Sequence, residues 1–120
     1  MKLILASAGV EGGDLTLKTL EEIKSADEII IQTALTPAGK YIAENFPSAV
    51  SLDGIYQKSR TYDTLNKNIA AEVLKAAKTK TVIFLTDGGV SENRACEIIL
   101  KKRKDAIVLL RTSFWKLSPF

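Results

Sequence analysis

The chain opens with the sequence LILASAGVEGGD at residues 3–14, an apolar run that leads into a glycine-rich loop. The same construction returns at residues 82–91 as VIFLTDGGVS. A predicted helix follows each loop. Open α/β sheets bind ligands at the carboxyl ends of their strands, and glycine there lets the backbone approach a ligand because it has no Cβ. The two loops therefore predict a ligand cleft at one edge of a sheet.

Apolar runs and helical patterns alternate along the rest of the chain. The predicted strands cover residues 2–7, 27–33, 48–52, 80–86 and 105–111, and the predicted helices cover residues 14–25, 37–45, 61–78 and 92–103. The strands are continuous apolar runs, typical of strands buried on both faces of a parallel sheet. We expect a doubly wound, mostly parallel five-stranded sheet with helices on both faces. The stretch from Asp53 to Arg60 is expected to be a loop.

Capping signals mark where the helices begin. Thr36 stands before Pro37, the favoured pair for an N-cap and the first helical position. Asp14 and Ser91 are the N-cap candidates for two other helices. In the long helix, apolar residues at helical spacing predict a buried stripe made of Leu65, Ile69, Val73 and Ala76.

Composition narrows the chemistry that the chain can perform. Its 120 residues make one domain of common size. There is no histidine, which removes the usual general base and the commonest metal ligand, so we expect no metal site. The single cysteine, Cys96, excludes an internal disulfide and fits a reducing, cytoplasmic compartment. No apolar run reaches the length of a bilayer span, so no membrane partner is expected.

The net charge of +3 is uneven, and much of the excess lies in the run KKRK at residues 101–104. We interpret this run as a solvated helix end, where cations complement the helix dipole. A nucleic-acid surface would need more basic residues and interleaved aromatic residues. Nucleic acid is therefore not the expected partner.

The loops do not match the common nucleotide motifs. The first loop is not G-x-G-x-x-G, and the second predicted strand ends Ile31-Gln32-Thr33, without the acid that holds a ribose hydroxyl in dinucleotide sites. Neither loop contains G-K-[ST], which excludes a P-loop. The cofactor is therefore of another class.

Residues 15–20 read LTLKTL, and Ala26-Asp27 begins the second predicted strand. With the opening glycine loop and the sequence TDGGV at residues 86–90, these pieces resemble the N-terminal half of the tetrapyrrole (corrin/porphyrin) methylases. The resemblance implies an S-adenosylmethionine-dependent methyltransferase acting on a small tetrapyrrole-like substrate. In that family the cofactor lies between two lobes, so residues 1–111 would form the first lobe and residues 112–120 the start of a linker into a second.

The middle of the chain looks most like the branch of that family that is fused to a MazG-type nucleoside triphosphate pyrophosphohydrolase. The matching pieces are TALTP at residues 33–37, SLDGIY at residues 51–56, the helix at residues 62–77 and TSF at residues 112–114. Apolar residues of the tail, including Phe114 and Trp115, have no following element to cover them. We expect them to pack in a homodimer or against the second lobe.

The loops also depart from the family pattern. The first loop lacks the family's proline, and the second has Asp-Gly-Gly where many members have Gly-Gly-Asp. The order Thr-Asp-x-Gly resembles the ribosomal RNA ribose methylases of the same fold. Two alternatives therefore stand beside the tetrapyrrole methylase: a ribose methylase, and a non-catalytic module that binds a ligand or supports oligomerisation.

Candidate site residues come from the resemblance and are cofactor contacts: Gly9, Val10, Asp87, Gly88, Gly89 and Ser113. The alternative for the first loop is that Gly9, Gly12 and Gly13 are turn glycines without a ligand, and Asp87 is a turn cap in the same interpretation. No catalytic residue is assigned. Positioning can supply much of the rate of a methyl transfer.

Other conspicuous residues have structural interpretations. Asp14 is expected to cap a helix rather than to bind a ligand. Tyr56 and Tyr62 are expected to be packing residues, and Cys96 a core residue on a helix face.

Overall fold

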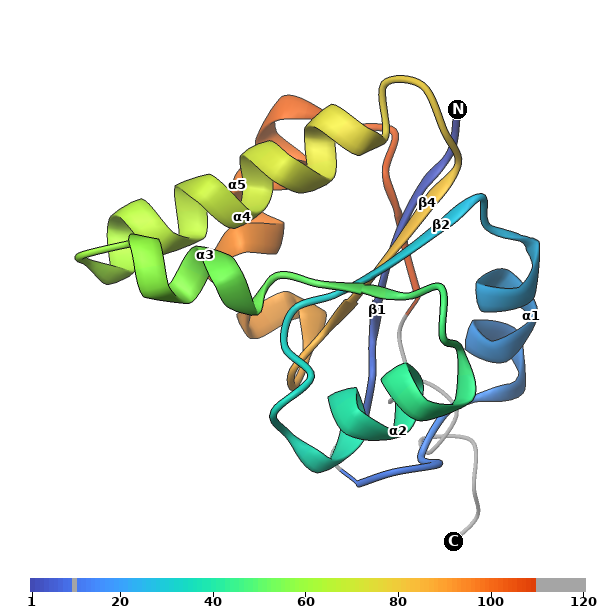
Figure 1. The fold of residues 1–120 in the computed structure, drawn as a ribbon. Coiled ribbons are helices and arrows are strands. Elements are labelled where there is room, and N and C mark those ends of the chain that lie inside the picture. The colour runs from blue at the N-terminus through green and yellow to red at the C-terminus, as the bar shows by residue number, and fades with distance from the viewer. Residues whose placement is uncertain (10, 110–120) are drawn as a thin grey trace, which may run out of the picture.

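The computed structural model describes residues 1–9 and 11–109 (Figure 1). Val10, Ser113 and the tail expected to form a linker or dimer contact lie outside the described residues. Five parallel strands form one sheet in the order β3-β2-β4-β1-β5. Their bounds are β1 Leu3–Ser7, β2 Glu28–Ile31, β3 Val50–Ser51, β4 Val82–Thr86 and β5 Ile107–Val108. The expected α/β class is confirmed, with an all-parallel sheet where a mostly parallel one was predicted.

Helices cover both faces of this sheet (Figure 1). Their bounds are α1 Leu17–Ser25, α2 Pro37–Asn45, α3 Asp53–Lys58, α4 Tyr62–Ala76 and α5 Arg94–Lys102, with a short 3-10 helix, η1, at Val90–Glu92. Successive residues of a strand point to opposite faces. Leu3 and Leu5 of β1 therefore pack in the core under α4 and α5, while Ile4 and Ala6 pack in the core under α1 and α2.

The three central strands match the predicted apolar runs, but the two edge strands are much shorter than predicted. β3 has two residues where residues 48–52 were predicted. Of the strand predicted at 105–111, residues 110–111 lie outside the described residues, and in the rest β5 covers Ile107–Val108. Each edge strand has one neighbour in the sheet. Val50 is 46% exposed, so burial supports β3 less than it supports β4, whose residues are all buried. Short edges also limit pairing with other chains.

One of the three predicted N-caps is confirmed and two are wrong. The Thr36 hydroxyl accepts a hydrogen bond from the Gly39 N–H and caps α2. Helix α1 is capped by Thr16, because the preceding loop turns on itself through a hydrogen bond from the Asp14 N–H to the Glu11 carbonyl. Helix α5 is capped by Asn93, because Ser91 lies within η1.

Helix α3 corrects the prediction of a loop from Asp53 to Arg60. The preceding Leu52 is buried and Ile55 packs against the same core as α4, so the segment gains burial by forming a helix. The carboxylate of Asp53 lies in the first turn, where it complements the helix dipole. Gly54 lowers the intrinsic helix propensity, which hides this short helix in the sequence.

The predicted stripe in the long helix is largely confirmed. Leu65, Ile69 and Val73 are buried on α4, whereas Ala76 is half-buried beside the buried Ala77. Tyr62, at the start of α4, is 85% exposed, so its interpretation as a packing residue is wrong. In residues 1–9 and 11–109, no helix has the length and apolar character that a membrane span requires.

The basic run at the end of α5 is engaged in structural contacts. The guanidinium of Arg103 donates hydrogen bonds to the carbonyls of Ala77 and Met1, and it pairs with Asp105. Lys101 lies 3.6 Å from the carboxylate of Glu97 one turn earlier. The contacts of Arg103 tie the end of α5 to the start of the chain and the end of α4.

Candidate functional site

The two glycine loops begin side by side at the carboxyl edge of the sheet. Strands β1 and β4 are neighbours, with Ser7 opposite Thr86 at their ends. One residue further on, the Ala8 N–H donates to the Thr86 carbonyl at 2.9 Å. The edge where ligands bind in open α/β sheets therefore carries both loops that the sequence singled out.

The loop after β4 leaves its backbone open. Gly88 has φ +86°, a conformation that side chains rarely adopt, and a Cβ built there meets no atom of residues 1–9 and 11–109 within 4 Å. The buried Thr86 hydroxyl donates to the Gly88 carbonyl at 2.9 Å and so fixes the peptide. Gly89 has an ordinary φ of −77°, and a Cβ there would lie 3.1 Å from Oε1 of Glu92. Gly88, rather than Gly89, is the position that requires glycine.

Asp87 lies exposed at the start of this loop. Within residues 1–9 and 11–109, its carboxylate makes no hydrogen bond or ion pair, while its N–H donates to the side chain of Gln32 at 3.1 Å. The structure therefore gives no support to Asp87 as a turn cap. Its carboxylate faces solvent at the edge that holds Gly88.

The loop after β1 is closed on itself. Gly9 has φ +94°, and a Cβ there would lie 2.6 Å from the carbonyl oxygen of Asp14. The Gly9 N–H donates to the Ser7 hydroxyl at 3.0 Å. Gly9 is thus required by the loop's own backbone. This supports the turn interpretation that the sequence left open.

The later glycines of this loop pack on α2. A Cβ on Gly12 would lie 3.1 Å from the Cβ of Tyr41, and a Cβ on Gly13, which has φ +82°, would lie 3.6 Å from the Tyr41 ring. The sequence analysis assigned no role to Tyr41. The only indication in the sequence is that Tyr41 lies in the predicted helix after the second strand. Its contacts give both glycines a structural role.

Helix α2 itself lies close to the end of β2. A Cβ on Gly39 would lie 1.9 Å from the carbonyl oxygen of Thr33, which no L-residue could tolerate without a backbone shift. The β2–α2 connection is further held by Asp53. Its carboxylate accepts hydrogen bonds from the Thr33 hydroxyl at 2.5 Å and from the Ala34 N–H at 2.9 Å.

These bonds change the ionisation of Asp53. Burial raises the pKa of the Asp53 carboxyl, but hydrogen bonds from Thr33, the Ala34 N–H and Ser51 outweigh it and lower the pKa below its usual value. Asp53 therefore stays ionised in neutral solution and joins Asp87 as a negative charge near this edge of the sheet.

A hydrogen-bonded group centred on Gln32 was missed by the sequence analysis. The Gln32 Oε1 accepts from the Asp87 N–H at 3.1 Å and from Nδ2 of Asn93 at 2.9 Å. Its Nε2 donates to the Tyr56 hydroxyl at 3.2 Å. The available signal was a polar residue directly after the apolar run EIII, at the carboxyl end of a strand.

Tyr56 lies on α3 and is 38% exposed. Burial raises the pKa of its phenol, the Gln32 hydrogen bond lowers it, and the charges of Asp53 and Asp87 raise it, leaving it above its usual value. The phenol therefore keeps its proton in neutral solution. Tyr56 is more than a packing residue because its hydroxyl takes part in the polar group at the edge.

Cys96 is a core residue, as predicted. It is fully buried on α5, and burial raises the pKa of its thiol to about 12. The thiol is therefore neutral and shielded in the folded chain, which excludes it as a nucleophile.

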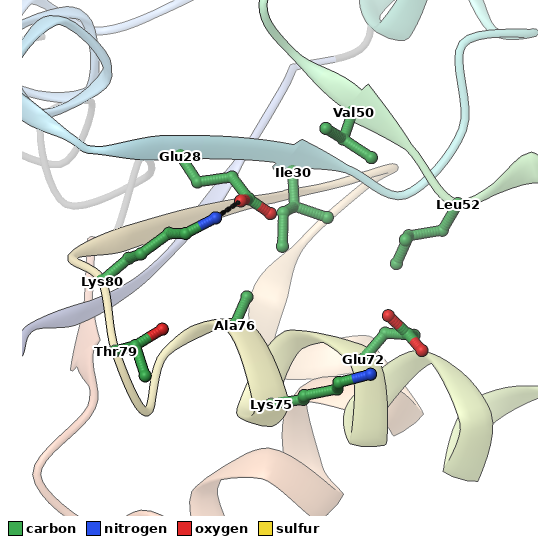
Figure 2. Close-up of a pocket in the computed structure, with 9 residues that line it drawn as sticks. All are labelled: Glu28, Ile30, Val50, Leu52, Glu72, Lys75, Ala76, Thr79 and Lys80. Carbon is green, nitrogen blue, oxygen red and sulfur yellow. Dashed lines mark hydrogen bonds and ion pairs between the residues drawn. The ribbon is translucent and has the colours of Figure 1, made fainter.

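A separate pocket lies between α4 and the face of β2 and β3 (Figure 2). Its volume is about 280 Å³, and its walls are formed by Glu28, Ile30, Val50, Leu52, Glu72, Lys75, Ala76, Thr79 and Lys80. At one end of the pocket, the ammonium group of Lys80 forms an ion pair with the carboxylate of Glu28 at 2.7 Å, so the two charges compensate each other. No described residue of the glycine loops lines this pocket.

No group of three or more acidic or cysteine side chains that could hold a metal ion occurs in the described ranges 1–9 and 11–109. Comparison of the chain with protein-family models gave no match, and comparison with curated proteins gave no significant match. The carboxyl edge, with Gly88 and Asp87 at its centre, is the candidate site on structural grounds.

Proposed function

We propose that this chain is a cofactor-binding lobe of an S-adenosylmethionine-dependent methyltransferase of the tetrapyrrole methylase type. The observation that carries the proposal is the open backbone at Gly88, beside the exposed carboxylate of Asp87, at the carboxyl edge of a parallel sheet. A ligand there could lie directly against the peptide. Under this proposal the protein works in the cytoplasm as a homodimer on a tetrapyrrole-like acceptor.

The charge of the edge supports this cofactor class. S-adenosylmethionine carries positive sulfonium and ammonium groups. The charged groups that act on the edge phenol of Tyr56 are the carboxylates of Asp53 and Asp87. Carboxylates attract a cation and repel the phosphates of a nucleotide. Electrostatics therefore favour a sulfonium cofactor over a nucleoside triphosphate.

Three residues at the edge would each make a different contact with the cofactor. Gly88 would let the ligand approach the backbone, Asp87 would accept hydrogen bonds from hydroxyl or ammonium groups, and Tyr56 would donate from its protonated phenol. When bound, the cofactor supplies an activated methyl group. This chain would bind and orient it, which is the main requirement of a displacement at carbon.

The closed first loop favours one alternative, a ligand-binding or oligomerisation module without catalysis. Gly9 is explained by the Asp14 carbonyl, and Gly12 and Gly13 are explained by Tyr41, without any ligand. In that case only the β4 side of the edge would be available for binding. The methyltransferase proposal differs because it requires a sulfonium cofactor at the same place.

Calorimetric titration of the protein separates these proposals. We expect S-adenosylhomocysteine and S-adenosylmethionine to bind, and ATP to bind at least tenfold more weakly, a difference of about 1.4 kcal/mol. Added salt should weaken the binding of S-adenosylmethionine more than the binding of S-adenosylhomocysteine, whose sulfur is uncharged. Binding of ATP without binding of either sulfur ligand would contradict the methyltransferase proposal and favour a nucleotide-binding module.

A further inference from the structure

The loop that follows β4 is held at both ends by one side chain. The Gln32 Oε1 accepts from the Asp87 N–H at the start of the loop, at 3.1 Å, and from the Asn93 side chain at its end, at 2.9 Å. Gln32 lies 55 residues from one partner and 61 from the other, so the bonds form only in the folded chain. Gly88 and Gly89 lie between the two attachment points.

Asn93 is itself fixed from the other side. Its Oδ1 accepts from the Cys96 N–H at 3.0 Å as the N-cap of α5, and its N–H donates to the Val90 carbonyl at 3.1 Å. The end of the loop is thereby joined to a helix packed in the core. Gln32 connects this fixed point to the first residue of the loop.

The two donors on the loop side fix which way the Gln32 amide points. Nε2 of Gln32 donates to the Tyr56 hydroxyl at 3.2 Å, while Oε1 takes the two donors on the loop side. Rotating the amide by half a turn would place its N–H₂ group against two other donors and would leave them unpaired. Because the Tyr56 oxygen accepts from Gln32, its own proton is free to point toward the edge.

We propose that Gln32 is a positioning residue that holds both ends of the loop Asp87–Asn93 and thereby fixes Asp87 and Gly88 for ligand binding. Its role in binding rests on the proposed function, but the holding of the loop does not. The same amide orients the Tyr56 hydroxyl as a donor. Gln32 joins β2, the β4 loop and α3 into one binding surface.

Gln32→Leu tests this role because leucine keeps much of the volume and removes all three hydrogen bonds. The matched control is Gln57→Leu, a change of the same type at an exposed position of α3. Amide hydrogen exchange, followed by NMR, measures how firmly the loop is held and needs no ligand. In Gln32→Leu we expect the Asp87 amide to exchange at least tenfold faster, with unchanged exchange in β1 and β4. Gln57→Leu should match the wild type.

Two further readouts separate positioning from a general loss of stability. The pKa of the Tyr56 phenol should rise in Gln32→Leu, since the lost hydrogen bond lowers it, and it should not change in Gln57→Leu. Gln32→Glu keeps both acceptor sites on the loop side. It should therefore keep the slow exchange of the Asp87 amide, and it replaces Gln32→Leu as the decisive variant if the leucine variant does not fold.

The outcomes also separate this inference from the proposed function. Failure of the wild type to bind S-adenosylhomocysteine would contradict the proposed function and leave the exchange test of Gln32 intact. If the wild type binds, Gln32→Leu should lose at least tenfold in affinity. Wild-type exchange at Asp87 in folded Gln32→Leu, or loss of that protection in folded Gln32→Glu, would overturn the role of Gln32.

Discussion

The loops after β1 and β4 have similar sequences but differ in packing: the glycines of the first contact other parts of the chain, whereas Gly88 of the second is open. In the β1 loop the space beside Gly9 is filled by the Asp14 carbonyl, and Gly12 and Gly13 contact Tyr41. In the β4 loop, no atom of the described part of the chain lies within 4 Å of a Cβ built on Gly88. A glycine-rich loop at the carboxyl edge of a strand thus serves close packing of the chain in one case and leaves backbone accessible in the other.

The largest effect is expected where α2, on which the closed loop rests, lies against β2. Gly39→Ala would place a Cβ 1.9 Å from the Thr33 carbonyl oxygen. We expect a loss of about 3 kcal/mol or more in the free energy of unfolding, measured by urea denaturation. Gly54→Ala is the control, since its Cβ meets nothing within 4 Å among the residues that the structure describes and alanine improves helix propensity by about 0.5–1 kcal/mol. Equal stabilities would contradict the close contact.

The direct comparison of the loops uses the same change at both positive-φ glycines. Gly9→Ala adds a steric clash to an unfavourable backbone conformation and should cost about 2–4 kcal/mol. Gly88→Ala meets no neighbour in the described part of the chain and should cost only about 1–2 kcal/mol, the free energy of the left-handed conformation. Urea denaturation of both variants measures the difference. A larger loss at Gly88 would mean that the second loop is the closed one.

The two glycines of the β4 loop should differ in their effect on ligand binding. Gly88→Val should weaken the binding of S-adenosylhomocysteine by more than about tenfold, or 1.4 kcal/mol, because the valine side chain fills the open space and strains the peptide. Gly89→Val should weaken it less, since its nearest neighbour is the flexible end of Glu92. Calorimetry on both variants, with Gly54→Val as the control, tests this order. Unchanged affinity in Gly88→Val would show that the loop is only a turn.

The smallest effect concerns acid stability near the open loop. The pKa of Asp53 is lower in the folded chain than its usual value of 3.8, so the unfolded chain takes up the proton first as the pH falls. The stabilisation is complete above about pH 5 and is lost as the pH falls through the folded-state pKa. Solvent screens this carboxylate, so the effect should be about 1 kcal/mol or less.

Urea denaturation at about pH 7 and about pH 3 measures this loss. Asp53→Asn should show a smaller decrease between the two conditions than the wild type. Glu44→Gln, at an exposed carboxylate on α2, should behave like the wild type. An unchanged decrease in Asp53→Asn would mean that its hydrogen bonds to the β2–α2 connection add no stability.

Much of the fold is encoded locally and could be predicted. Continuous apolar runs identified the three central strands, because burial on both faces demands such runs. Thr36 and Pro37 marked the start of α2. The edge strands were overestimated because their length depends on a single neighbour, and α3 was missed because its stability comes from Ile55 packing in the core rather than from propensity.

The candidate site was predictable only in outline. The sequence located the edge and named Asp87, Gly88 and Gly89, but Val10 and Ser113 lie outside the described residues. The sequence could not distinguish the role of Gly9 from that of Gly88, because the two glycines differ in what fills the space beside each one in the folded chain. The sequence places a polar residue, Gln32, at the carboxyl end of a strand, but it could not show the hydrogen-bond partners of Gln32, which come from distant parts of the chain.

The buried thiol of Cys96 supplies the molecule with a chemical reporter at an informative place. Cys96 lies in the first turn of α5, and its N–H bonds to Asn93, the residue that Gln32 holds. A small alkylating reagent can reach the sulfur only when this turn opens or the whole chain unfolds. Labelling that is faster than global unfolding would therefore record local opening of the helix beside the candidate site.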